Sequence, residues 1–116
     1  MTNRVTILGK LLDDPKLKSF EARGGTIEIV SLWVEVKDDI RADRFTVEIN
    51  DPKAQTAAKA MRKDVLVEVS GKLRHDRWKS KVTGQWTGKV FIALDPGEGN
   101  IRSKGVATEA ERAEAA

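Results

Sequence analysis

KLRHDRWKSKVTGQWTGK, residues 72–89, separates the last two strand-like segments of the chain. It carries six Lys or Arg side chains against one carboxylate, Asp76, so its net charge is +5. Two of the three tryptophans, Trp78 and Trp86, lie in it, and Val-Thr-Gly at 82–84 is typical of a turn. A simple hairpin needs only about two to five loop residues. The stretch therefore predicts a long cationic loop held between two strands.

This composition suits single-stranded nucleic acid, because cations meet phosphates and indole faces meet unstacked bases. The alternative is a solvated hairpin whose tryptophans pack back onto the body of the protein. The basic surplus belongs to the part of the chain that we expect to fold, since residues 1–94 carry +5 and residues 95–116 carry −2. This surplus is modest, so the prediction depends on its clustering in one loop.

Segments on both sides of this loop alternate between apolar and polar residues, as strands with one wet face do. We expect five strands: a first that covers 4–12 and resumes at 16–20 after a turn, then 26–37, 44–49, 65–71 and 90–94. Gly9 marks a bend in the first, and a shift of apolar parity at 29–30 predicts a bulge in the second. The parity after this shift places Trp33 outside the core. Asp51 and Pro52 open a short helix that runs to Arg62 and Lys63.

This order of elements predicts an all-β OB-fold, a five-stranded Greek-key barrel with one short helix between strands three and four. The OB-fold domain is expected to span residues 1–95. The Gly-, Ala- and Glu-rich remainder, 96–116, is expected to be a disordered tail.

Composition excludes several classes of protein. There is no cysteine and only one histidine, His75, so disulfides, thiolate sites and multi-histidine metal sites are excluded. A metal site made of carboxylates alone stays open, but no stretch has the pattern of an EF-hand loop, so we expect no metal and no cofactor. We also expect no catalytic residue, because no set of nucleophile, base and oxyanion donor can be assembled. No apolar run has the length of a membrane span, which predicts a protein that stays in the cytoplasm.

Residues 2–94 resemble the bacterial single-stranded DNA-binding protein family in the order and spacing of several short motifs. These are Asn3–Gly9 with Asp14-Pro15, Met61–Lys63 ahead of Val67–Leu73, and Arg77-Trp78-Lys79 with Gly84-Gln85. The resemblance implies binding of single-stranded DNA during replication, recombination or repair, and assembly as a homotetramer, with a dimer as the alternative. Of the aromatics on which that family stacks bases, only Trp78 has a matching position; Arg44 stands where one of the others is usual.

The candidate residues divide into rings that stack bases and cations that meet phosphates. The rings are Trp78, Trp86 and Trp33, and the cations are Arg4, Arg44, Lys72, Arg74, Arg77, Lys79 and Lys81. The alternative for Trp33 is burial between subunits, and for any single cation it is a solvated surface charge. The acidic tip that the family uses to recruit repair enzymes has no counterpart in Ala113–Ala116, so no such recruitment is expected.

Two other functions remain open. The first is a primosome, replication-restart or phage accessory protein, which would act mainly through protein contacts. It is suggested by a resemblance to the primosomal replication protein N, another small OB-fold protein that opens with Met-Thr-Asn-Arg and acts as a dimer. The second is an OB module that binds structured RNA.

Overall fold

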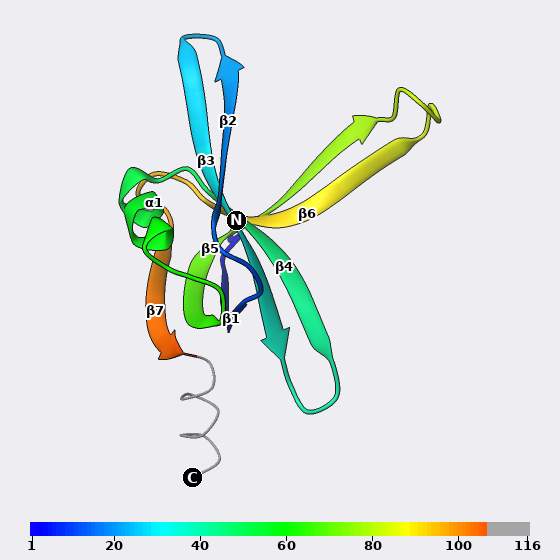
Figure 1. Cartoon of the computed structure of the whole chain (residues 1–116). Coiled ribbons are helices and arrows are strands. Elements are labelled where there is room, and N and C mark those ends of the chain that lie inside the picture. The colour runs from blue at the N-terminus through cyan, green and yellow to red at the C-terminus, as the bar shows by residue number, and fades with distance from the viewer. Residues whose placement is uncertain (107–116) are drawn as a thin grey trace.

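A computed structural model describes residues 1–106, which form seven strands and one helix (Figure 1). The elements are β1 (Val5–Leu11), β2 (Lys16–Ala22), β3 (Gly25–Lys37), β4 (Ala42–Ile49), α1 (Pro52–Lys59), β5 (Val65–Lys79), β6 (Trp86–Leu94) and β7 (Asn100–Val106).

Five of the strands close into a ring in the order β1-β3-β4-β6-β5, with β5 pairing back to β1. All of these pairings are antiparallel except β4 with β6. The ring and the helix between β4 and β5 confirm the predicted five-stranded barrel. Its interior is filled by fully buried aliphatic side chains, among them Leu11, Leu32, Val47, Ile49 and Ile92.

Gly9 lies where β1 leaves β5 and begins to pair with β3. A Cβ atom at this position would overlap the carbonyl oxygen of Glu35 and lie 2.8 Å from Cγ1 of Val34. Gly71 occupies the equivalent point on β5, where a Cβ would lie 2.5 Å from the carbonyl oxygen of Ala93. Both glycines therefore allow a close approach of two backbones at a corner of the barrel.

Gly9→Val is expected to destabilise the barrel by about 1–3 kcal/mol, because the new side chain overpacks this corner. The measurement is the urea midpoint followed by circular dichroism. Ser19→Val is the matched control, since it introduces the same side chain at an exposed strand position and should leave the midpoint nearly unchanged. Equal midpoints for Gly9→Val and the unmodified protein would contradict the close approach.

The helix begins as predicted. The Asp51 carboxylate accepts a hydrogen bond from the backbone N–H of Ala54 at 3.3 Å, and Pro52 follows it in the first turn. The helix ends at Lys59, earlier than predicted, and Arg62 donates to the carbonyl oxygens of Lys59 and Met61. This basic side chain therefore caps carbonyl groups at the C-terminal end of the helix.

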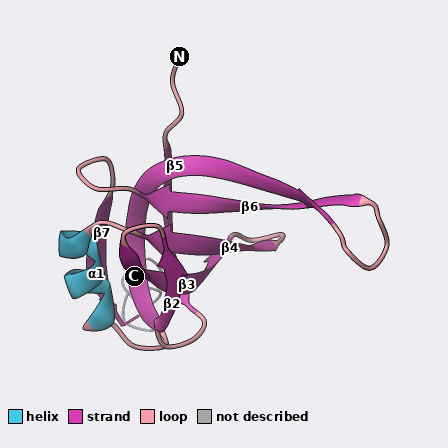
Figure 2. Cartoon of the chain, turned by 90° about the horizontal axis from the view of Figure 1, so that it is seen from above, coloured by secondary structure: helices cyan, strands magenta, loops and turns pink. Residues whose placement is uncertain are grey.

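The predicted loop at 72–89 is mostly strand. β5 runs on to Lys79 and β6 starts at Trp86, so only residues 80–85 connect them. The two strands form a hairpin, the arm (residues 72–91), which extends away from the barrel (Figure 2). At its tip, the Ser80 side chain accepts from the backbone N–H of Val82 and Thr83. Gly84 takes the positive φ of 72° expected of this turn residue.

Two other predictions were wrong. The bulge at 29–30 does not form, because the pairing of β3 with β2 runs through these residues without a register shift. The tail prediction fails for residues 100–106, which form β7 on the edge of β5 and bury Ile101. Its remaining part, residues 107–116, lies outside the described residues.

Candidate nucleic-acid interface

The strand register assigns the arm residues to two opposite faces. Residues paired across two strands share a face, and the faces alternate along each strand. Trp78 pairs with Thr87, whereas Trp86 pairs with Lys79, so the two tryptophans of the arm lie on opposite faces. The face of Trp78 continues the outside of the barrel and is called the outer face. The face of Trp86 continues the inside, because it leads to the buried Ile92, and is called the inner face.

The outer face presents two half-exposed indole rings. Trp33 on β3 is 42% exposed and pairs with Thr46, and Trp78 on β5 is 47% exposed. The prediction that Trp33 lies outside the core is confirmed. The strands that carry them, β3 and β5, are joined through β4 and β6 in one continuous sheet. Trp33 and Trp78 therefore stand on the same surface.

Four cations of the outer face are already paired with carboxylates. Arg44 reaches Glu35 at 3.4 Å and Lys89 reaches Glu48 at 2.8 Å. Lys72 pairs with Glu98 and Arg74 with Asp95. Three of these cations, Arg44, Lys72 and Arg74, were predicted phosphate contacts. A phosphate that approached them would have to compete with a carboxylate for each one.

The Arg74–Asp95 pair holds the base of the arm to the segment that follows β6. The hydrogen bond from the Arg74 guanidinium lowers the pKa of the Asp95 carboxyl, and Asn50 donates a second hydrogen bond at 3.4 Å. The same pair raises the pKa of Arg74. The charged forms of both residues are thus favoured in the folded protein.

The lowered pKa of Asp95 predicts a pH dependence of stability. The unfolded chain binds a proton at the ordinary Asp pKa of about 3.9, above that of the folded state, so the stabilisation is present above this pH. It is lost as pH falls through the folded pKa. Asp95→Asn should therefore be less stable than the unmodified protein at pH 6, and the difference in stability between the two should become smaller below pH 4. Urea midpoints of both proteins across this pH range test the prediction. A difference in midpoint that does not change with pH would contradict it.

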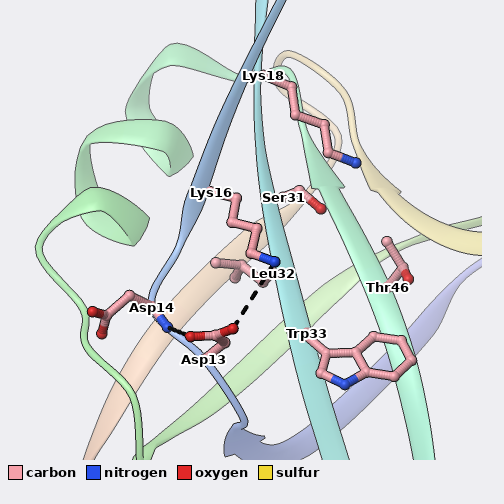
Figure 3. Close-up of a pocket in the computed structure, with 8 residues that line it drawn as sticks. All are labelled: Asp13, Asp14, Lys16, Lys18, Ser31, Leu32, Trp33 and Thr46. Carbon is pink, nitrogen blue, oxygen red and sulfur yellow. Dashed lines mark hydrogen bonds and ion pairs between the residues drawn. The ribbon is translucent and has the colours of Figure 1, made fainter.

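The outer face is hollowed beside Trp33, in a cavity of about 420 Å³ between β2, β3 and β4 (Figure 3). The indole ring forms one wall, and the hydroxyls of Ser31 and Thr46 lie along the same face. The side chains of Lys16 and Lys18 stand over the cavity from β2, with the Lys16 ammonium 3.9 Å from the Asp13 carboxylate. Neither lysine was among the predicted contacts, although their i, i+2 spacing places them on one strand face.

The inner face carries the third tryptophan. The ring of Trp86 is 65% exposed, and the Arg77 guanidinium lies 5.6 Å from its centroid, within the range of a cation–π contact. Lys79 is the cross-strand partner of Trp86. Within residues 1–106, Arg77, Lys79 and Lys81 form no ion pair.

The structure thus divides the predicted site in two. Trp33, Trp78, Arg44, Lys72 and Arg74 share the outer face, whereas Trp86, Arg77 and Lys79 lie on the inner face. Lys81 is in the tip of the arm, and Arg4 precedes β1 beside Asn3, whose side chain bonds to the backbone of Leu73.

Residues 1–106 bring together no group of three potential metal ligands. They also contain no helix with the length and apolar character that crossing a membrane requires.

Two structures of known proteins share this fold. A Plasmodium falciparum SSB in complex with ssDNA superposes with a TM-score of 0.75 at 18% identity, over 89% of this chain and 95% of that one. A mitochondrial single-stranded DNA binding protein from S. cerevisiae gives a TM-score of 0.66 at 11% identity, over 91% and 99%. At these identities the likeness establishes the fold alone.

Sequence relatives establish the family. The single-stranded DNA-binding protein 1 of Nostoc sp. is 32% identical over 93 residues, which cover 80% of this chain and 78% of the relative. A protein of the same name from Synechocystis sp. is 28% identical over 96 residues, with the same coverage. The resemblance to the primosomal replication protein N stays a hypothesis. Since residues 2–95 match the single-strand binding protein family over most of the chain, the protein belongs to that family.

Proposed function

We propose that this protein binds single-stranded DNA with little sequence preference and coats it during replication, recombination or repair. One observation carries the proposal: two half-exposed indole rings, Trp33 and Trp78, stand on one continuous sheet face among cationic side chains. Rings of this kind stack any base, because every base has a π-face. The names of the sequence relatives support the same function. Such a protein acts without catalysis, in the cytoplasm where DNA is unwound.

The contacts on the outer face have separate roles. Trp78 and Trp33 stack bases, and the cavity beside Trp33 gives a second surface to the base that lies there. Arg44, Lys72 and Arg74 exchange their carboxylate partners for phosphates, and Lys16 and Lys18 extend the same path onto β2. Arg4, next to the base of the arm, adds a further phosphate contact. These phosphate contacts fix the strand on the protein without reading its sequence.

The direct test is titration with oligo(dT) while tryptophan fluorescence is recorded. We expect quenching that saturates, and binding to a duplex of the same length that is much weaker, because paired bases cannot stack on the rings. Absence of quenching at low salt, or equal affinity for duplex, would reject the proposed function. Tighter binding to a folded RNA than to oligo(dT) would favour the RNA-binding alternative.

Salt should weaken this binding. If the six cations named above neutralise about six phosphates, the slope of log K against log salt for a single strand is about −4, which is roughly a 300-fold loss between 50 and 200 mM. Lys18→Gln should make the slope shallower by about 0.7, since it removes one phosphate contact. The fluorescence titration repeated at four salt concentrations measures this. An equal slope for Lys18→Gln and the unmodified protein would contradict a phosphate contact at Lys18 on β2.

We further propose that the protein is a homo-oligomer, as a tetramer. The edge of β1 supports this, because within residues 1–106 the segment 5–9 pairs with β5 on one side only, and Leu8 beside that edge is half-exposed. An exposed strand edge is a surface on which a second copy can pair. The mass in solution, measured with and without oligo(dT), decides between a tetramer and a dimer.

A further inference from the structure

The inner face of the arm has a composition of its own. Its residues are Leu73, His75, Arg77 and Lys79 on β5 and Trp86, Gly88 and Val90 on β6. There is no carboxylate among them, whereas Asp76 and the partners of Lys72, Arg74 and Lys89 all belong to the outer face or its rim. The cations of the inner face are therefore available to an anionic ligand without displacement of a carboxylate.

Three side chains of this face form one unit. Gly88 leaves room for its neighbours: a Cβ there would lie 2.8 Å from the His75 imidazole and 3.3 Å from Cγ of Arg77. The Arg77 side chain lies across this gap and brings its guanidinium 5.6 Å from the centroid of the Trp86 ring. The ring remains 65% exposed, the most open of the three tryptophans. The unit thus places a cation beside an open indole face.

Charge decides what this face can bind. A second copy of the chain that paired here about a two-fold axis would set the same face against itself, because such interfaces are isologous. Arg77 and Lys79 would then face a patch that carries the same cations and no acid, and like charges brought together repel. The fitting ligand is anionic and has flat apolar parts, as the phosphates and bases of a single strand do.

We propose that the inner face of the arm is a second contact for single-stranded DNA, in which Trp86 stacks a base and Arg77 and Lys79 hold the flanking phosphates. This rests on the function proposed above and adds to it. Among the described residues, β5 pairs with β6 alone from Arg74 to Lys79, so the arm is two strands wide there and neither edge is paired. A long strand bound on the outer face can pass round an edge to the inner face. Each protein chain then binds more nucleotides than its outer face alone could contact.

Two single-tryptophan variants test this. The Trp33→Phe/Trp78→Phe variant keeps only Trp86 as a reporter, and the Trp33→Phe/Trp86→Phe variant keeps only Trp78, with phenyl rings left at the other positions. With long poly(dT) we expect both reporters to be quenched. With an oligo(dT) of about eight nucleotides, within the usual site size of one OB-fold, we expect quenching of Trp78 and little of Trp86.

Failure of each proposal has its own signature. If neither reporter is quenched by any strand, the proposed function itself fails. If Trp78 is quenched and Trp86 is not, even by saturating poly(dT), the function stands and the second contact is overturned.

The occluded length gives an independent measurement. Trp86→Ala with Arg77→Gln should leave the affinity for the short oligo(dT) within about twofold and reduce the number of nucleotides bound per chain on poly(dT). An unchanged number of nucleotides would overturn the proposal. A loss of solution mass in this variant without DNA would do so as well, because it would identify the inner face as a contact between copies.

Discussion

Replacing Trp33 and Trp78 together by Ala is expected to weaken binding of an oligo(dT) of about eight nucleotides by roughly 30-fold to 20,000-fold. Each stacked base contributes about 1–3 kcal/mol, so each single variant should lose roughly 5-fold to 150-fold. The two rings stand on different strands, β3 and β5, and are proposed to stack different bases. Their effects should therefore add.

The readout is a competition titration against a labelled oligo(dT), because the double variant retains only Trp86. Trp86→Ala is the matched control: it removes a more exposed ring from the other face of the same arm and should barely change the affinity for the short strand. All three rings are more than one-third exposed, so neither variant should affect folding strongly. Losses below threefold in the double variant would exclude the outer face as the main contact.

Patterns of burial explain which parts of the fold the sequence predicts. In β4, Val47 and Ile49 alternate with wet residues because one face lies in the core, and this produces a clear period of two. The same reasoning placed Trp33 outside the core. At α1, the Asp51–Pro52 start is local chemistry that needs no knowledge of the rest of the chain.

Elements that extend beyond the core give no such pattern. Ile27 is half-exposed on β3, where it lies opposite Phe20 in the β2–β3 hairpin. Its apolar side chain therefore does not mark the core face of the strand, and the resulting change of pattern was misread as a bulge. In the arm, both faces of the strands are exposed to solvent, so the sequence has no apolar alternation and was predicted to be a loop. β7 buries only Ile101 among the residues whose burial is described, too weak a signal to distinguish a strand from a polar tail.

The division of the site into two faces depends on information that is not local. Trp78 and Trp86 are eight residues apart, and their relative orientation is set by the register across the turn at 80–85. The partners of the outer-face cations are also distant: Glu48 is 41 residues from Lys89. The composition of residues 72–89 predicted cations and rings, but only the pairing shows which cations are free.

Ile92→Ala is expected to destabilise the protein by about 2–5 kcal/mol, a large share of the total stability of a small domain. Ile92 is 1% exposed and pairs with Val47 on one side and Leu73 on the other, so the truncation leaves a cavity where the arm joins the barrel. The measurement is the urea midpoint, followed by circular dichroism without DNA.

Val90→Ala is the matched control, because Val90 lies two residues earlier on the same strand and the same face but is 57% exposed. It should change stability by no more than about 0.5 kcal/mol. A large loss of stability for Ile92→Ala and a small one for Val90→Ala would place the end of the core between these two residues. The inner face of the arm beyond Ile92 would then be open to solvent. Comparable losses in the two variants would mean that Val90 is covered in solution, which contradicts an inner face that is free to receive a DNA strand.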